Sequence, residues 1–145
     1  MFRDIRDILD AWRSTGPSLP EDPEAYSLIS EAQQALSQGD CDAALRIVEE
    51  VVGRWPTYPW VWLISAIVRR QAGNSVAARA DLAVAIALAP ADPTPLRQLA
   101  YTLCKEGDSE TAGQVMEQAW DLYRRIMRKR VTEQDREDFF ADLAA

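Results

Sequence analysis

The chain has 145 residues, a formal net charge of −7 and no histidine. That length suits one domain, 1–145, with a sizeable core. The negative charge argues against nucleic acid as a partner, and no apolar run approaches the roughly 20 residues of a membrane span. We therefore expect a cytoplasmic protein that does not span a membrane.

Residues 1–15 are predicted to form an N-terminal flanking helix. Apolar side chains recur there at helical spacing and make one stripe that could serve self-association. The residues of this stripe are Phe2, Ile5, Ile8, Leu9 and Trp12. The segment has no signal-peptide core, because charged and apolar residues alternate along it. Residues 16–24, rich in proline and acidic residues, are predicted to be a linker.

A glycine followed by Asp or Asn recurs with a period of 34 residues. The pairs are Gly39-Asp40, Gly73-Asn74 and Gly107-Asp108. Glycine takes the left-handed conformation without steric cost and so ends one helix, and Asp or Asn favours the start of the next. The period predicts three units of two helices each, which are residues 25–58, 59–92 and 93–130.

Each unit has small residues where its two helices would meet, which lets the helices approach closely. These are Ala32, Ala66 and Ala100 in the first helices, and Ala44, Ala78 and Ala112 in the second. Pro56 and Pro90 would stop the second helix of the first two units. Arg124 replaces proline in the third unit, so that helix is predicted to run from about Ser109 to Arg130. No strand signal competes, and the chain is predicted to be all-α.

These features resemble the tetratricopeptide repeat family. The second unit alone carries much of the family's pattern, with Trp62, Ala66, Gly73, Asn74, Ala78, Leu82, Ala85 and Pro90. The resemblance covers about residues 25–123 and implies three helix pairs stacked into a right-handed superhelical solenoid with a concave and a convex face. The expected fold has flanking helices at both ends of the three tandem repeats.

Residues 131–145 are predicted to form a C-terminal capping helix. Thr132 and Asp135 have the spacing of a capping box, and Phe139, Phe140 and Leu143 could pack back on the third repeat. A solenoid needs such a cap, because its terminal repeat otherwise exposes the face on which the next repeat would stack.

The residue types present give little support for catalysis. Without histidine, neither a Ser–His nor a Cys–His nucleophile pair can form, and zinc sites built on Cys and His are excluded. Cys41 and Cys104 are predicted to be two reduced thiols. No glycine-rich phosphate loop is present. We expect no enzyme, no metal and no cofactor.

The resemblance implies a peptide-binding groove, because in the family the first helix of each pair lines the concave surface. Carried over by position, the groove residues are Tyr26, Ile29, Gln33 and Leu36 in repeat one, Trp60, Leu63, Ile67 and Arg70 in repeat two, and Thr94, Arg97, Tyr101 and Cys104 in repeat three. One subclass of the family binds carboxylates through Lys and Asn at the positions of Ile29 and Gln33. That carboxylate clamp is therefore absent.

The expected function is that of a protein–protein interaction module, an adaptor or chaperone-like protein that binds an extended or hydrophobic polypeptide segment in this groove. A self-assembling scaffold subunit is the alternative, and the N-terminal helix or a second copy of the chain could instead cover the groove. Length, three repeats and helical flanks are also similar to bacterial type III secretion chaperones for translocator proteins. That likeness would imply a homodimer, formed through residues 2–12.

Overall fold

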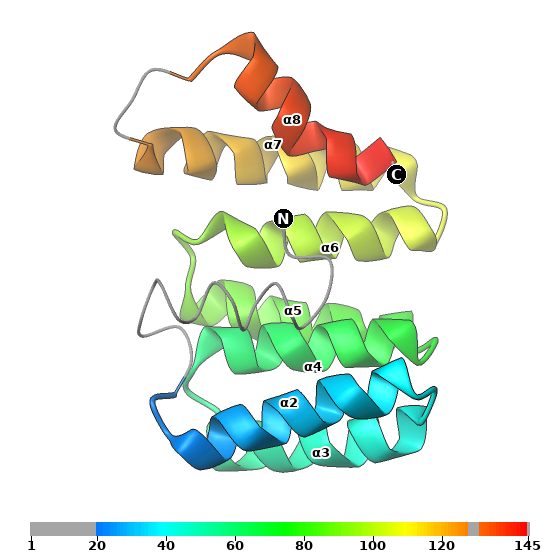
Figure 1. Cartoon of the computed structure of the whole chain (residues 1–145). Coiled ribbons are helices and arrows are strands. Elements are labelled where there is room, and N and C mark those ends of the chain that lie inside the picture. The colour runs from blue at the N-terminus through cyan, green and yellow to red at the C-terminus, as the bar shows by residue number, and fades with distance from the viewer. Residues whose placement is uncertain (1–19, 128–130, 145) are drawn as a thin grey trace.

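The computed structural model describes residues 20–127 and 131–144, and this part of the chain consists of seven α-helices without a strand (Figure 1). The helices are α2 (Pro23–Ser37), α3 (Cys41–Arg54), α4 (Pro59–Gln71), α5 (Ser75–Leu88), α6 (Pro93–Lys105), α7 (Ser109–Ile126) and α8 (Glu133–Ala144). The all-α prediction is confirmed. The predicted helix 1–15, with the stripe from Phe2 to Trp12, lies outside the described residues.

The helices pack as three hairpins, α2–α3, α4–α5 and α6–α7, which stack in chain order (Figure 1). Each second helix also packs on the first helix of the following pair. The first helices α2, α4 and α6 contact one another in turn, whereas within the described residues α3, α5 and α7 do not. The first helices are therefore closer together than the second helices and lie on the concave side of a helical solenoid.

The turn inside each hairpin has the predicted geometry. Gly73 has φ +89°, a left-handed conformation that ends α4. The side chain of Asn74 then accepts a hydrogen bond from the backbone N–H of Ala77, at 3.1 Å, and so caps the start of α5. The turns at Gly39-Asp40 and Gly107-Asp108 repeat this arrangement. The 34-residue period in the sequence therefore corresponds to one helical hairpin.

The core forms where the helices of each hairpin meet. All six alanines that the sequence places at these contacts are at most 2% exposed. Larger apolar side chains complete the core on both sides of them, among them Ile64, Leu82 and Met116, none of which is exposed. Burial of an apolar side chain of this size stabilises the fold by about 1.5–3 kcal/mol. The buried apolar residues form two clusters, one in the first two hairpins and one in the third hairpin with α8.

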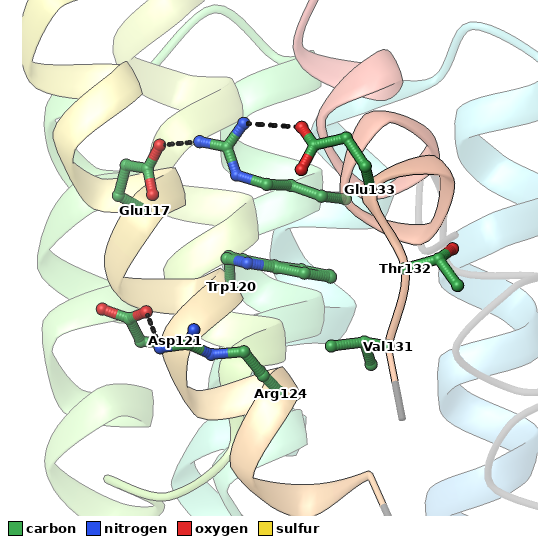
Figure 2. Close-up of a pocket in the computed structure, with 8 residues that line it drawn as sticks. Glu117, Trp120, Asp121, Arg124, Val131, Thr132 and Glu133 are labelled. Atoms are coloured by element: carbon green, nitrogen blue, oxygen red, sulfur yellow. Dashed lines mark hydrogen bonds and ion pairs between the residues drawn. The ribbon is translucent and has the colours of Figure 1, made fainter. Parts of the chain in front are cut away.

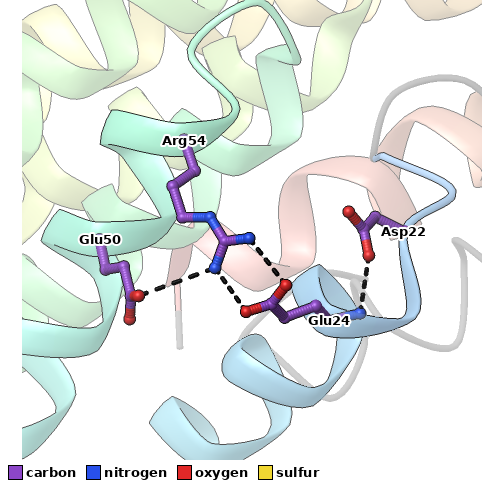
Figure 3. Close-up of polar contacts among 4 residues, drawn as sticks. All are labelled: Asp22, Glu24, Glu50 and Arg54. Carbon is purple, nitrogen blue, oxygen red and sulfur yellow. Dashed lines mark hydrogen bonds and ion pairs between the residues drawn. The ribbon is translucent and has the colours of Figure 1, made fainter.

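An ion pair joins the start of α2 to the end of α3 (Figure 3). Both terminal nitrogens of Arg54 donate to the Glu24 carboxylate, at 2.6 and 2.7 Å. This hydrogen bonding holds the pKa of Glu24 below its ordinary value. Any contribution to stability is therefore lost as the pH falls through that lowered pKa. The pair is well exposed, so it contributes little at neutral pH.

Helix α7 is longer than α3 and α5, with 18 residues against 14, as the missing proline predicts. The predicted end at Arg130 is wrong, because Met127 is already extended, with φ −69° and ψ 125°. The chain must leave the helix there for the next segment to return to the third hairpin. Helix α8 then begins with the predicted capping box, in which Thr132 and Asp135 exchange hydrogen bonds of 2.8 and 3.1 Å.

Helix α8 packs against both α6 and α7 (Figure 1). Phe139 is 3% exposed, and its ring centroid lies 5.3 Å from that of Trp120 and 5.0 Å from that of Tyr123. Phe140 and Leu143 adjoin the same cluster. The predicted packing of α8 on the third repeat is confirmed. No helix in the described ranges is long and apolar enough to cross a membrane.

Candidate functional site

Several of the predicted groove residues are inaccessible in the structure. Ile29, Leu63 and Ile67 have no exposed surface and belong to the core, and Trp60 is 5% exposed. A partner could contact these side chains only after the surrounding structure rearranged. These four predicted groove residues therefore do not form an open surface in this conformation, and their binding role stays a prediction.

Trp60 joins the second hairpin to the third. Its indole N–H donates to one carboxylate oxygen of Asp92 at 2.8 Å. The other oxygen of Asp92 accepts the backbone N–H of Thr94, at 2.9 Å, and so caps α6. Thr94, which the family resemblance also places in the groove, is 8% exposed. This end of the first helices is therefore fixed by contacts between repeats.

In the third repeat, α8 covers part of the predicted groove. Arg97 is 4% exposed, its guanidinium donates to the carbonyl of Phe139 at 3.1 Å, and its Cζ lies 3.8 Å from the centroid of the Phe139 ring. Cys104 Sγ lies 3.9 Å from the carbonyl oxygen of Leu143. Sequence reasoning predicted the cap and the groove residues but missed that they meet. The signal was available, because a cap packs where the first helix of a further repeat would pack.

A second group of predicted groove residues remains partly exposed. It consists of Gln33 and Leu36 on α2, Arg70 on α4, and Tyr101 and Cys104 on α6, and we call it the concave edge. Tyr26, at the other end of α2, is also partly exposed. Leu36, Arg70 and Cys104 are 34 residues apart, and each is the last residue but one of its helix. In each repeat, the fold therefore places one partly exposed side chain beside the glycine turn of that repeat.

Arg70 is the charged centre of the concave edge. Its Nη1 donates to Gln98 Oε1 at 3.0 Å and lies 3.4 Å from both the Gln98 carbonyl oxygen and Thr102 Oγ1. The guanidinium carbon also lies 5.9 Å from the Tyr101 ring centroid. Burial lowers the pKa of Arg70, yet arginine stays protonated in proteins. A partly buried cation therefore links α4 to α6.

Sequence reasoning named Arg70 but missed the two residues that orient it. Gln98 is 1% exposed and Thr102 is fully buried. A comparison of repeats could have found them, because the same positions in the second repeat are the apolar residues Ile64 and Val68. Buried polar side chains in place of apolar ones indicate a partner that needs hydrogen bonds.

Another buried charge lies within the second hairpin and has its partners there. Asp81 is 3% exposed, accepts a hydrogen bond from the Ser65 hydroxyl at 2.7 Å and pairs with Arg69 Nε at 3.4 Å. Burial raises the pKa of Asp81, against the opposing effects of Ser65 and Arg69. Since these contacts all lie between α4 and α5, the group holds a hairpin together and does not present a binding surface.

We expect the stability of the Asp81→Asn variant, relative to wild type, to increase as the pH rises. Because the folded state raises the pKa of Asp81, the carboxyl stabilises the fold most below its ordinary pKa and loses that contribution as the pH rises through the folded-state value. Asparagine does not titrate and can still accept from Ser65. Urea denaturation below the ordinary pKa of aspartate, at about pH 3.5, and again at about pH 8 should show that the free energy of unfolding of the variant rises relative to that of wild type between the two pH values. A stability difference between Asp81→Asn and wild type that does not change with pH would contradict this.

A pocket of about 310 Å³ lies between α7 and the start of α8 (Figure 2). Its charged side chains pair with one another: Arg136 with Glu117 and Glu133, and Arg124 with Asp121 at 3.0 Å. A ligand would have to displace these pairs to gain a charged contact. The pocket is therefore a weaker candidate than the concave edge.

No family model matches the chain, and no curated protein matches its sequence. A comparison with solved structures finds the TPR domain of Sgt2 from Aspergillus fumigatus, with a TM-score of 0.65 and 18% identity. The match covers 89% of this chain and 85% of that one. Together with the three stacked hairpins, it shows that the chain has the fold of a tetratricopeptide repeat domain.

Proposed function

We propose that the protein is a non-enzymatic interaction module that binds an extended polypeptide segment along its concave edge. The observation that carries this proposal is the row of partly exposed side chains at one position of three stacked repeats, Leu36, Arg70 and Cys104. Equivalent positions on stacked repeats form a continuous surface, which suits an extended chain.

The concave edge combines the side-chain types that bind polypeptides. Leu36 offers apolar surface, Tyr101 an aromatic ring, and Gln33 and Arg70 polar groups. Aromatic residues and arginine are enriched at protein interfaces. Because Leu63 and Ile67 are buried, the accessible surface leaves out these two predicted groove residues. A narrow surface of mixed chemistry supports a transient interaction with a short segment.

Two narrower roles follow from the sequence analysis. A chaperone-like role would require the bound segment to be a hydrophobic part of another protein, and the apolar surface of Leu36 supports this form of the proposal. A self-assembling scaffold would stack through its terminal faces, but α8 already packs on α6 and α7, where a further unit would add. We therefore favour peptide binding. Residues 2–12, expected to form a homodimer, lie outside the described residues.

The proposal is tested by selecting random displayed peptides on the full-length chain and measuring the affinity of synthetic copies. Leu36→Gln removes the apolar contact on α2 and should weaken binding roughly tenfold. Val76→Gln is the matched control, because Val76 is 70% exposed and lies on α5, the second helix of its hairpin, outside the concave edge. Far-UV circular dichroism should show both variants folded. Failure to enrich any peptide, or equal affinity for Leu36→Gln and wild type, would refute the proposed site.

A further inference from the structure

We propose that Arg70 is a recognition site for the side-chain carboxylate of an Asp or Glu in the bound segment, an inference that rests on the proposed function. Every acceptor that Arg70 contacts is neutral: an amide oxygen, a backbone carbonyl and a hydroxyl. All three contacts are made by the same nitrogen, Nη1. Within residues 20–127 and 131–144, neither Nη2 nor Nε of Arg70 has a hydrogen-bond acceptor, and no carboxylate forms an ion pair with it.

The geometry of the guanidinium suits a carboxylate. Arginine binds carboxylates through two parallel hydrogen bonds from adjacent nitrogens. With Nη1 held by Gln98 and Thr102, the Nη2–Nε edge is the part still able to form such a pair. Because Gln98 and Thr102 are themselves buried, the guanidinium is held in place before the partner arrives. Such pre-organisation reduces the conformational entropy lost on binding.

Arg70 differs from the arginines that form ion pairs within the fold. Five others, Arg54, Arg69, Arg79, Arg124 and Arg136, each pair with a carboxylate of the chain. A partly buried charge without a counter-charge opposes folding, because it loses hydration without gaining an ion pair. A carboxylate from the bound segment would supply that counter-charge. The contact would also be stronger than a pair on the open surface, since water screens it less.

The residues around Arg70 favour a bound segment with a single carboxylate over one with a run of acidic residues. The chain carries a net charge of −7, and the side chains of the concave edge around Arg70 are neutral: Gln33, Leu36, Tyr101 and Cys104. A second acidic residue would gain no partner there and would be repelled by the chain as a whole. Arg70 also belongs to the middle repeat, with Leu36 and Cys104 on either side. A segment lying along the edge would therefore place its carboxylate near its centre and not at its C-terminus.

The test uses the selected peptides, synthesised with amidated C-termini, in a double-mutant cycle. We expect an acidic residue to be enriched at one position among them. Replacing it with the neutral amide, Glu→Gln or Asp→Asn, should weaken binding to wild type roughly tenfold, as for a hydrogen-bonded charge, but should have little effect on binding to Arg70→Gln. Arg70→Lys keeps the charge without the planar fork and should restore only part of the affinity. The control Arg46→Gln, at an exposed position on α3, should bind like wild type.

The outcomes separate this inference from the function on which it rests. Peptides that require Leu36 but show no acidic position, or whose acidic residue is not coupled to Arg70, would overturn the inference and leave peptide binding intact. Peptides that bind only through a free C-terminal carboxylate would also overturn it. If no peptide binds, the proposed function fails and the inference fails with it. Thermal melting shows whether the Arg70→Gln variant is folded. If it is not, the double-mutant cycle with Arg70→Lys decides whether the acidic residue is coupled to Arg70.

Discussion

Leu63→Glu is expected to destabilise the protein by about 5 kcal/mol or more. Leu63 has no exposed surface and lies in the core of the second hairpin. The substitution removes the packing of a leucine, which alone costs about 2–5 kcal/mol, and it places an unpaired carboxylate in an apolar environment. Since whole domains are stable by about 5–15 kcal/mol, the variant should be largely unfolded. Urea denaturation followed by far-UV circular dichroism measures the effect.

The same substitution distinguishes the structure from the expectation based on sequence. The family resemblance places Leu63 on an open groove, where a glutamate would be tolerated and only binding would suffer. Leu88→Glu is the matched control, because Leu88 is 43% exposed at the end of α5 and its substitution should change stability by about 0.5 kcal/mol or less. A Leu63→Glu protein as stable as this control would show that Leu63 is accessible.

Phe139→Ala should cost about 3 kcal/mol and release α8 from the third hairpin. The ring packs against Trp120 and Tyr123 and covers the guanidinium of Arg97. Truncation of a buried phenylalanine leaves a cavity and costs about 3–5 kcal/mol, of which partial collapse recovers some. Amide hydrogen exchange within residues 133–144 should accelerate, while exchange in α4 and α5 should be unaffected.

Phe140→Ala provides the comparison on the same helix. Phe140 is only partly buried and contacts Arg136, whose Cζ lies 4.5 Å from its ring centroid. A cation–π contact at such a site contributes about 0.5–1 kcal/mol, so this variant should lose much less stability than Phe139→Ala. Equal losses for the two variants would contradict the assignment of Phe139 as the residue that anchors α8.

The sequence was sufficient to predict the fold because its local signals repeat. A glycine that needs positive φ, a capping Asp or Asn after it, and alanines at close helix contacts occur three times at one spacing, and each was found where predicted. The capping box of Thr132 and Asp135 is equally local. Where a local signal was missing, as at the end of α7, the predicted boundary at Arg130 was wrong.

The candidate site was harder to predict because accessibility depends on the whole assembly. Position within a repeat suggests which helix face a residue lies on, and on that basis Leu63 and Arg70 were both placed in the groove. It does not say what else packs on that face, and the structure buries Leu63 but leaves Arg70 partly exposed. The contact of Arg97 with Phe139 joins residues 42 positions apart, beyond the reach of the 34-residue pattern.

The place of α8 has a consequence for the evolution and redesign of this chain. A helix that packs on both α6 and α7 lies where the first helix of a fourth repeat would begin. At this end of the array, α8 therefore takes a place that a fourth repeat would need. Inserting a 34-residue unit ahead of Pro93 would lengthen the array and still keep the contacts of α8 with α6 and α7.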